Sequence, residues 1–427
     1  MKKKLGYIGV SILAAAVLLS SCLSGSLSGS LQLYEDLGVS STKNSKNMPD
    51  TPDADLIVST LAGEGKKGLR NGPGDTARFR YPAGMTVDPF GNVYVADAIN
   101  RGIRMIEPNG EVNIPALMPF NGDVYKTGGL LAGTTGSRSI AMIINGIGAH
   151  LFANPMDVIV GADGYLYMVA YQDNRIWKIA PGHRVEPQQV RYGNKFNIGG
   201  EVSVLVGSYP FLSGDKDGSI NEAEFNYPRA LATDGAGNIY VADTGNHRIR
   251  KITTRGEVLT LAGSKRGFKD GAGAEAKFHE PIGIAVDSKG NVYVADSHNH
   301  SIRKVTPEGV VSTLAGSGEG GFVDGSTTEA QFNRPTGVAV DSEGNVYVAD
   351  QKNNLIRKIT PEGMVSTYAG NGMAGFSDGS AVTARFRNPY DVVVDSDNTI
   401  YVSDTGNQRI RIIEDESRPR QDVVHAK

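Results

Sequence analysis

Hydrophobic and polar positions alternate in short runs along residues 56–413, and no sustained helical spacing appears. In the runs GIAVD (283–287) and NVYVAD (291–296), apolar and small residues recur at every second position, which is typical of β-strands. The residues between the two runs include Asp287 and Gly290, which favour a tight hairpin turn. Two further strands are expected at 301–307 and 310–317, so this unit predicts a small sheet of four antiparallel strands.

The same unit occurs six times, and each copy begins at a proline. The six prolines are Pro82, Pro155, Pro228, Pro281, Pro335 and Pro389. Successive prolines among the last four lie 53 or 54 residues apart, whereas the first two intervals are 73 residues, so the first two units contain insertions. One such sheet would leave two apolar faces and two edges exposed, and stacking six around an axis removes that exposure. The pattern predicts an all-β fold, a six-bladed β-propeller with four antiparallel strands per blade.

Closure of the ring is predicted from an unused strand. The sixth unit ends at residues 409–413, and the charged tail 414–427 follows without a VSTLAG-like strand. Such a strand, LIVSTLAG, stands at residues 56–63, ahead of the first proline. We therefore expect the N-terminal strand to complete the last blade and to place Thr60 near Arg411. The six fourth strands are then expected at Leu56–Gly63, about Gly128–Gly133, Val202–Ser208, Val258–Ser264, Val311–Ser317 and Val365–Asn371.

The recurring phrases P-x-G-V-A-V-D, N-V-Y-V-A-D, D-x-x-N-x-x-I-R-K and S-T-L-A-G resemble NHL repeats over nearly all of residues 56–413. The resemblance is weakest in the second unit, where Ala170 replaces the aspartate and Trp177-Lys178 replaces Arg-Lys. It implies a six-bladed NHL-repeat propeller of the bacterial lipoprotein type. It implies little about activity, because this fold serves binding modules, RNA binders, scaffolds and a few enzymes.

The N-terminal segment has the layout of an export signal. Lys2, Lys3 and Lys4 precede an apolar run at residues 5–19, and the sequence Leu-Ser-Ser-Cys that ends at Cys22 resembles a lipobox. That resemblance implies a signal peptide at residues 1–21 and lipid attachment at Cys22, while an ordinary cleaved signal with a chance cysteine is the alternative. Residues 22–55 are rich in Ser, Asp and Asn and are interpreted as the lipidated Cys and a flexible tether.

These features predict an exported protein anchored to the membrane of the cell envelope. Leu23 stands where an aspartate would retain many Gram-negative lipoproteins in the inner membrane, so in such a cell we expect the outer membrane. The net charge is −3, and removal of residues 1–21 with their three lysines would lower it to −6. This charge argues against nucleic acid as a partner. Envelope proteins or glycans are the partners that we expect.

One aspartate and one arginine recur in nearly every unit. The aspartates are Asp97, Asp243, Asp296, Asp350 and Asp404, and the arginines are Arg104, Arg250, Arg303, Arg357 and Arg411. Each aspartate is expected at a strand end, accepting hydrogen bonds from turn amides or from the arginine. A feature used once per blade solves a structural problem of the repeat, so we assign these residues no catalytic role.

The candidate ligand-binding residues are Asp157, Arg229 and Asp391. Asp157 and Asp391 stand two positions after a proline, where the other units have Gly or Ala. They are expected at the mouth of the central channel, where lactonases of the gluconolactonase and regucalcin type hold a metal. The alternative is a purely structural role, in which each carboxylate caps the start of its own strand. No Ser-His-Asp arrangement, phosphate-binding loop or paired-acid motif occurs, so no catalytic residue is predicted.

His247, His298 and His300 are candidate metal ligands in neighbouring turns, because a His-x-His pair with a third histidine can bind zinc. The alternative is a generic polar turn position, since His247 and His300 align with Arg101, Asn174, Asn354 and Gln408. Apart from such a divalent metal, no cofactor is predicted.

The two insertions are expected between the third and fourth strands of the first two blades, at about Asn109–Thr127 and Pro181–Gly200. The first is followed by an apolar stretch, residues 137–155. On adjacent blades, the insertions would form either a partner-binding patch or a plug over the blade ends.

The sequence thus favours a non-catalytic, lipid-anchored envelope propeller that acts as a binding or protein-interaction scaffold. A metal-dependent hydrolase or lyase of lactonase type, with its site at the channel mouth, is the first alternative. A glycan-binding module is the second.

Overall fold

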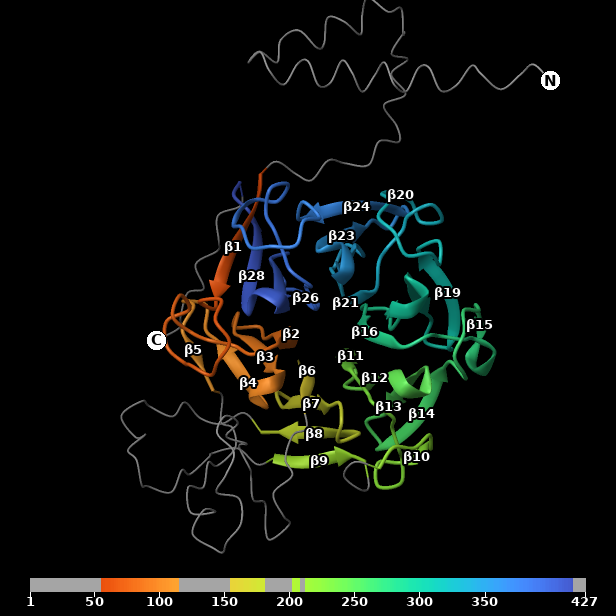
Figure 1. Ribbon diagram of the computed structural model, residues 1–427. Coiled ribbons are helices and arrows are strands. Elements are labelled where there is room, and N and C mark those ends of the chain that lie inside the picture. Colours follow the sequence, from red (N-terminus) through yellow and green to blue (C-terminus); the bar gives the residue numbers. More distant parts are fainter. Residues whose placement is uncertain (1–54, 115–153, 181–201, 208–211, 418–427) are drawn as a thin grey trace, which may run out of the picture. The chain divides into compact units, whose positions relative to one another are not determined.

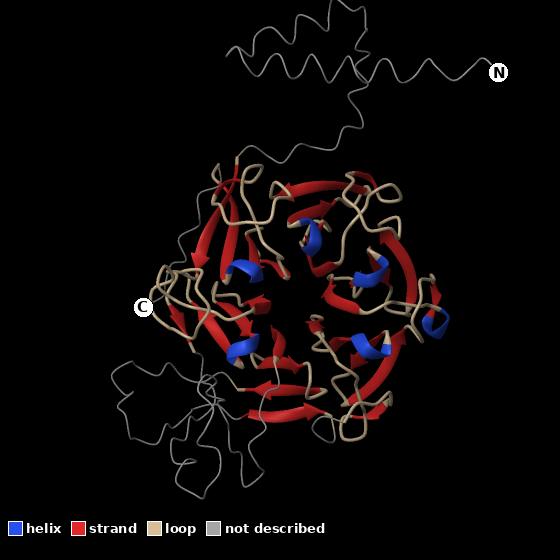
Figure 2. Ribbon diagram, in the orientation of Figure 1, coloured by secondary structure: helices blue, strands red, loops and turns tan. Residues whose placement is uncertain are grey.

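The protein is a six-bladed β-propeller. A computed structural model describes residues 55–114, 154–180, 202–207 and 212–417, and six sheets stand around a central axis in it (Figure 1). The helical segments of the described residues are single 3-10 turns, most of them at one end of the blades (Figure 2). The all-β, six-bladed fold predicted from the alternation is confirmed. No helix among the described residues has the length and apolar character that a membrane span requires.

Blade 4 represents the regular unit. Its inner strand β16 (Pro281–Val286) is followed outward by β17 (Val292–Asp296), β18 (Ser301–Val305) and β19 (Val310–Ala315), all antiparallel. The 3-10 turn η6 (Ser297–Asn299) joins β17 to β18, and residue 300 at its end adopts the left-handed conformation. Tight turns at residues 287–290 and 306–309, each closed by a glycine, join the other strands at the opposite end of the blade.

The remaining strands follow the same order from the channel outward. Blade 1 contains β2 (Pro82–Val87), β3 (Val93–Asp97), β4 (Gly102–Ile106) and β5 (Val112–Asn113), and blade 2 contains β6 (Pro155–Val160), β7 (Leu166–Ala170), β8 (Arg175–Ile179) and β9 (Val202–Val206). Blade 3 contains β11 (Ala230–Thr233), β12 (Ile239–Asp243), β13 (Arg248–Ile252) and β14 (Glu257–Ala262), and blade 5 contains β21 (Pro335–Val340), β22 (Val346–Asp350), β23 (Leu355–Ile359) and β24 (Met364–Ala369). Blade 6 contains β26 (Asp391–Val394), β27 (Ile400–Asp404), β28 (Arg409–Asp415) and β1 (Leu56–Ala62). The other 3-10 turns are η1 (Ala98–Asn100), η4 (Thr244–Asn246), η5 (Gly273–Glu275), η7 (Gln351–Asn353) and η8 (Thr405–Asn407).

Four blades have a fifth strand that the sequence pattern did not predict. These two-residue strands are β10 (Gly218–Ser219), β15 (Gly271–Ala272), β20 (Gly325–Ser326) and β25 (Gly379–Ser380). Each lies in the segment that leads into its blade and pairs with the fourth strand of that blade. Two residues are too few for an alternating pattern, so only their pairing reveals them.

Ring closure occurs as predicted. The N-terminal strand β1 pairs antiparallel with the C-terminal strand β28, with Thr60 opposite Arg411 and Leu56 opposite Asp415. In Figure 1 the red β1 lies beside the blue β28. The last blade therefore combines both ends of the propeller, and the backbone hydrogen bonds of β1 remove an open edge.

The fourth strand of blade 1 corrects one expectation. It is β5, which follows β4 through a short hairpin, so an insertion between the third and fourth strands at 109–127 is wrong. Asn109 belongs to that hairpin instead. The strand expected near 128–133 and most of the apolar stretch 137–155 lie outside the described residues. The second insertion, 181–200, also lies outside them, between β8 and β9.

The recurring aspartate and arginine form buried ion pairs inside the blades, as expected. Asp296 accepts a hydrogen bond from the amide of His279 at 2.7 Å and pairs with Nη1 of Arg303 at 2.7 Å. The guanidinium of Arg303 also lies 5.2 Å from the centre of the Phe278 ring. In blade 2, which lacks this pair, Nε1 of Trp177 donates a hydrogen bond to Asp173 at 3.1 Å. The motif thus ties the strand, the turn and the preceding segment together.

Candidate functional site

A small polar pocket lies where the inner strands begin around the central axis. The six strands β2, β6, β11, β16, β21 and β26 contribute its lining, which includes Asp157, Arg229, Tyr390 and Asp391. The empty space amounts to about 380 Å³, part of it open to solvent. Three residues singled out in the sequence, one each from blades 2, 3 and 6, therefore meet in one pocket.

Both channel carboxylates are hydrogen-bonded to backbone amides of a neighbouring blade. Asp157 accepts a hydrogen bond from its neighbour Val158 at 2.8 Å and one from Leu231 of blade 3, also at 2.8 Å. Asp391 accepts a hydrogen bond from the amide of Met85 of blade 1 at 2.8 Å. Each aspartate thus links the start of its own inner strand to the start of the next one.

The glycines at the same position in adjacent blades make room for these carboxylates. A Cβ atom added to Gly84 would lie 2.1 Å from Oδ1 of Asp157, and one added to Gly337 would lie 2.4 Å from Oδ1 of Asp391. Blades converge toward the axis, so the inner strand has little room for side chains on one of its faces. At these two positions the neighbouring aspartate is a further reason for glycine.

Burial of the two carboxylates is not compensated by a cation. Burial raises the pKa of Asp391 to about 7. Burial also raises the pKa of Asp157 well above its usual range, and the nearby charge of Asp391 raises it further. No ion pair among the described residues joins Arg229 to either carboxylate. Near neutral pH, protonation of this pair relieves an unfavourable buried charge.

Arg229 and Tyr390 bring polar atoms with unused hydrogen-bonding capacity to the pocket. The guanidinium of Arg229 lies 4.6 Å from the centre of the Tyr171 ring, and its Nη2 donates a hydrogen bond to the Tyr171 hydroxyl at 3.3 Å. Nε of Arg229 and the hydroxyl of Tyr390 are buried and make no hydrogen bond of ordinary geometry among the described residues, although the two side chains interact with each other. Such atoms are stabilised when a ligand supplies their partner.

His247 and His300 have a shared structural role in the seams between blades. Nδ1 of His247 accepts a hydrogen bond from the amide of Glu280 at 3.2 Å, and Nδ1 of His300 accepts one from the amide of Arg334 at 3.2 Å. Asn354 accepts the equivalent bond from Asn388 at 3.0 Å. These contacts match the alternative of a generic polar turn position, and they show why an acceptor is needed there.

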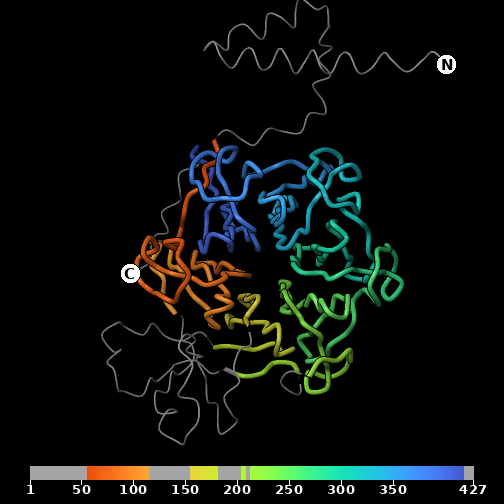
Figure 3. The backbone as a smooth tube through the Cα atoms, viewed as in Figure 1, coloured from red at the N-terminus to blue at the C-terminus, as the bar shows by residue number. Residues whose placement is uncertain are grey.

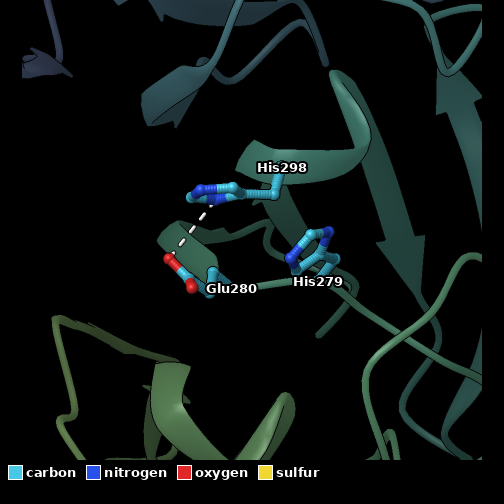
Figure 4. A group of neighbouring side chains, drawn as sticks. All are labelled: His279, Glu280 and His298. Atoms are coloured by element: carbon cyan, nitrogen blue, oxygen red, sulfur yellow. Dashed lines mark ion pairs between the residues drawn. The ribbon is translucent and has the colours of Figure 1, made fainter.

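His298 lies in a different environment, together with His279 and Glu280. Nδ1 of His298 is 3.3 Å from Oε2 of Glu280, and the ring centres of His279 and His298 are 4.7 Å apart. Figure 4 shows the Glu280 carboxylate directed toward the ring of His298, with His279 beside them. Three potential metal-binding side chains therefore gather at the end of blade 4, and of the three candidate histidines only His298 is among them.

Burial lowers the pKa of both imidazoles in this cluster. The pKa of His279 falls to about 4, chiefly through burial and then through the nearby positive charge of Arg266. Burial also lowers the pKa of His298, against the opposing effect of Glu280. Both rings are therefore neutral at physiological pH, which leaves nitrogen lone pairs free for other partners.

Sequence reasoning missed His279, Glu280 and Tyr390. His279 and Glu280 directly precede Pro281, where the other units carry Arg, Asn or Tyr among other residues. The unusual residues at these two positions were the available signal. They become a candidate site only because η6, which carries His298, folds back over the start of β16. Tyr390 follows Pro389 directly, and only the structure shows that it lines the pocket.

The fold and pocket define a six-bladed β-propeller with a polar channel mouth. The NHL repeat model matches residues 225–252, 278–305, 332–359 and 386–413, which form the inner three strands of blades 3 to 6. The chain is an NHL-repeat β-propeller protein.

Two curated proteins and one solved structure illustrate the likeness. The chain is 31% identical over 328 residues to NHL repeat-containing protein 2 of Gallus gallus, covering 72% of this chain and 42% of that protein. It is 28% identical over 317 residues to the chloroplastic protein SUPPRESSOR OF QUENCHING 1 of Arabidopsis thaliana, covering 71% and 27% respectively. The chain thus spans less than half of these curated relatives. A crystal structure of an auxiliary nutrient binding protein from Bacteroides thetaiotaomicron superposes with a TM-score of 0.58 at 17% identity, covering 84% of this chain and 76% of that one, and shares the fold.

Proposed function

We propose that the protein is a non-catalytic binding scaffold of the cell envelope, anchored through a lipid on Cys22, whose propeller receives its partner at the channel mouth. One observation carries the proposal: the channel carboxylates are engaged with backbone amides, whereas Nε of Arg229 and the Tyr390 hydroxyl make no hydrogen bond of ordinary geometry among the described residues. The two carboxylates thus hold neighbouring blades together, whereas Arg229 and Tyr390 retain hydrogen-bonding capacity for a ligand.

The chemistry of the pocket favours a partner that presents hydrogen-bond acceptors. Arg229 can only donate hydrogen bonds, and the partly exposed rings of Tyr81 and Tyr227 offer flat apolar surfaces. An acidic or carbonyl-bearing group of an envelope protein or glycan fits both features. The similar Bacteroides propeller is described as nutrient binding, which is consistent with a binding role for this fold.

A metal-dependent hydrolase or lyase at the same mouth would need Asp157 and Asp391 as metal ligands. Their hydrogen bonds to Val158, Leu231 and Met85 direct these carboxylates toward the backbone of the ring. The described pocket lining contains no third carboxylate and no histidine, and it includes the cation Arg229, so the enzyme remains the less favoured function.

Capture of partners from native envelope, after chemical cross-linking, tests the proposal. We expect the wild-type chain to recover a specific partner and Arg229→Gln to recover at least tenfold less, because the cation is lost. Arg255→Gln is the matched control, since exposed Arg255 lies in the β13–β14 hairpin at the other end of blade 3. Equal recovery by all three chains would contradict a site at the channel mouth.

Lipid attachment is tested separately by labelling cells with radioactive palmitate. The wild-type chain should incorporate the label, and Cys22→Ser should not. Label on the Cys22→Ser chain, or none on either, would contradict anchoring through this residue.

A further inference from the structure

The group His279, Glu280 and His298 has the composition of a transition-metal site. One potential ligand atom from each residue lies within 4.8 Å of the other two. His279 and Glu280 are held at the start of β16, and His298 is held in η6 above them (Figure 4). All three side chains are partly exposed, so an ion from solvent can reach them.

The contact between His298 and Glu280 suits two ligands of one ion better than a direct hydrogen bond. Their 3.3 Å separation is close to the roughly 3.4 Å expected between two ligand atoms that each lie about 2.1 Å from a tetrahedral metal. Nδ1 of His298 is buried and makes no hydrogen bond that meets ordinary geometry. This nitrogen is therefore a second, independent sign that a partner belongs here.

We propose that His279, Glu280 and His298 bind one Zn²⁺ ion. Two imidazole nitrogens and one carboxylate oxygen form a ligand set that zinc commonly takes. The set supplies three protein ligands, so a fourth position stays open toward solvent. This inference does not rest on the proposed function, because zinc binding is measured without any envelope partner.

The surroundings define what the open position would accept. Three cations surround the site. The positive charge of Arg266 is close enough to His279 to disfavour a second positive charge there, and Arg229 and Arg334 have the same effect on His298. They oppose a bare divalent ion, and the Glu280 carboxylate offsets only part of that charge. The open position therefore favours an anion, either hydroxide or the carboxylate of a ligand.

Other blades supply substitutions that the fold already accepts. The position of His279 is occupied by Asn226 and Asn333, whose amides bond the strand-end aspartate in the same way. Asn388 stands at the position of Glu280, and Lys352 stands at the position of His298. The variants His279→Asn, Glu280→Asn and His298→Lys, singly and combined, should therefore fold.

Two further variants serve as matched controls. His247→Asn and His300→Asn remove imidazoles close to the cluster and retain the acceptor that Asn354 provides in blade 5. If the assigned ligands are correct, neither control should change zinc affinity by more than twofold.

The experiment is calorimetric titration of the metal-stripped full chain with zinc chloride, without a polyhistidine tag. The background is Cys22→Ser, so that the thiol cannot contribute. We expect one Zn²⁺ per chain, at least tenfold weaker binding for each single ligand variant, and no binding for the combined variant. Cobalt substitution should give a visible spectrum typical of four or five ligands in the wild-type chain only.

Three outcomes would overturn the site. The first is no stoichiometric zinc binding by a folded wild-type chain, and the second is unchanged binding by the combined variant. The third is an equal loss of affinity in His300→Asn. Circular dichroism of each variant separates loss of the site from loss of the fold. If zinc binds but the envelope capture fails, the metal site stands and the proposed scaffold function falls.

Discussion

Two groups of buried aspartates differ in the partners of their carboxylates: an arginine side chain in one group and backbone amides in the other. In the strand-end group, Asp296 is fully buried beside Arg303, and burial raises its pKa to about 6 although the guanidinium opposes the shift. In the channel group, Asp391 has a backbone amide as its partner, its pKa rises to about 7, and its neighbour Asp157 adds a like charge. A raised pKa is therefore common to a structural and a candidate functional position. The partners of the carboxylate, and not the shift, separate the two.

Stability should depend more on the partner of a strand-end aspartate than on the partner of a channel aspartate. Arg303→Met would leave Asp296 buried without its cation, and we expect the free energy of unfolding to fall by about 3–5 kcal/mol. Urea denaturation followed by tryptophan fluorescence and circular dichroism measures this change. Arg255→Met, at an exposed turn, should change stability by less than about 0.5 kcal/mol. A loss below about 1 kcal/mol in Arg303→Met would remove the distinction between the two groups.

Blade 2 offers a way to build the strand-end pair where it is missing. Trp177→Arg alone should destabilise the protein by about 2–3 kcal/mol, because it removes a buried indole and leaves the new guanidinium to share the Asp173 carboxylate with Arg175. Adding Ala170→Asp should recover about 1–2 kcal/mol of that loss. A double-mutant cycle on unfolding free energies measures the coupling, and purely additive effects would show that the pair depends on more of its repeat.

Removal of a charge from the channel should raise the free energy of unfolding instead of lowering it. Asp391→Asn retains an oxygen for the amide of Met85 and removes the like charge beside Asp157. We expect an increase in unfolding free energy on the order of 1 kcal/mol at pH 8. Thermal unfolding provides the measurement, and Asp296→Asn under identical conditions should instead destabilise. A destabilised Asp391→Asn would indicate that the carboxylate contributes more than acceptance of one bond.

The smallest expected effect is on the pH dependence of stability. Because the folded pKa of Asp391 is about 7 and its ordinary value is 3.8, its stabilising contribution is complete below about pH 4 and is lost as the pH rises to about 7. Asp391→Asn should therefore flatten the stability profile between these limits. Part of the slope should remain, since Asp97, Asp243, Asp296 and Asp350 have raised pKa values of about 6. A slope unchanged by the substitution would contradict the shift.

Much of the fold was accessible from the sequence, because the strands alternate and the unit recurs at nearly constant spacing. Blade number and the pairing of Thr60 with Arg411 followed from counting strands. The fourth strand of blade 1 was misplaced because Val112–Asn113 is only two residues long and lacks the S-T-L-A-G phrase.

The site was less accessible, because its contacts cross between segments and often end on backbone atoms. Asp157 and Asp391 were placed at the channel mouth, but a side-chain pattern cannot show that the amides of Leu231 and Met85 are their partners. His279 and His298 are separated by β16, β17 and the turn between them, so no short motif contains both.

The pairing of β1 with β28 has a consequence for biogenesis. The first strand of the propeller, β1, must wait for the last one, β28, before either is fixed, and long-range contacts of this kind form slowly. Until synthesis reaches Asp415, blade 6 lacks a neighbour for β1, and a prematurely terminated chain has no substitute for it. A chain that stops before β28 should therefore keep the edge of β1 unpaired, and only synthesis of β28 can seal the disc.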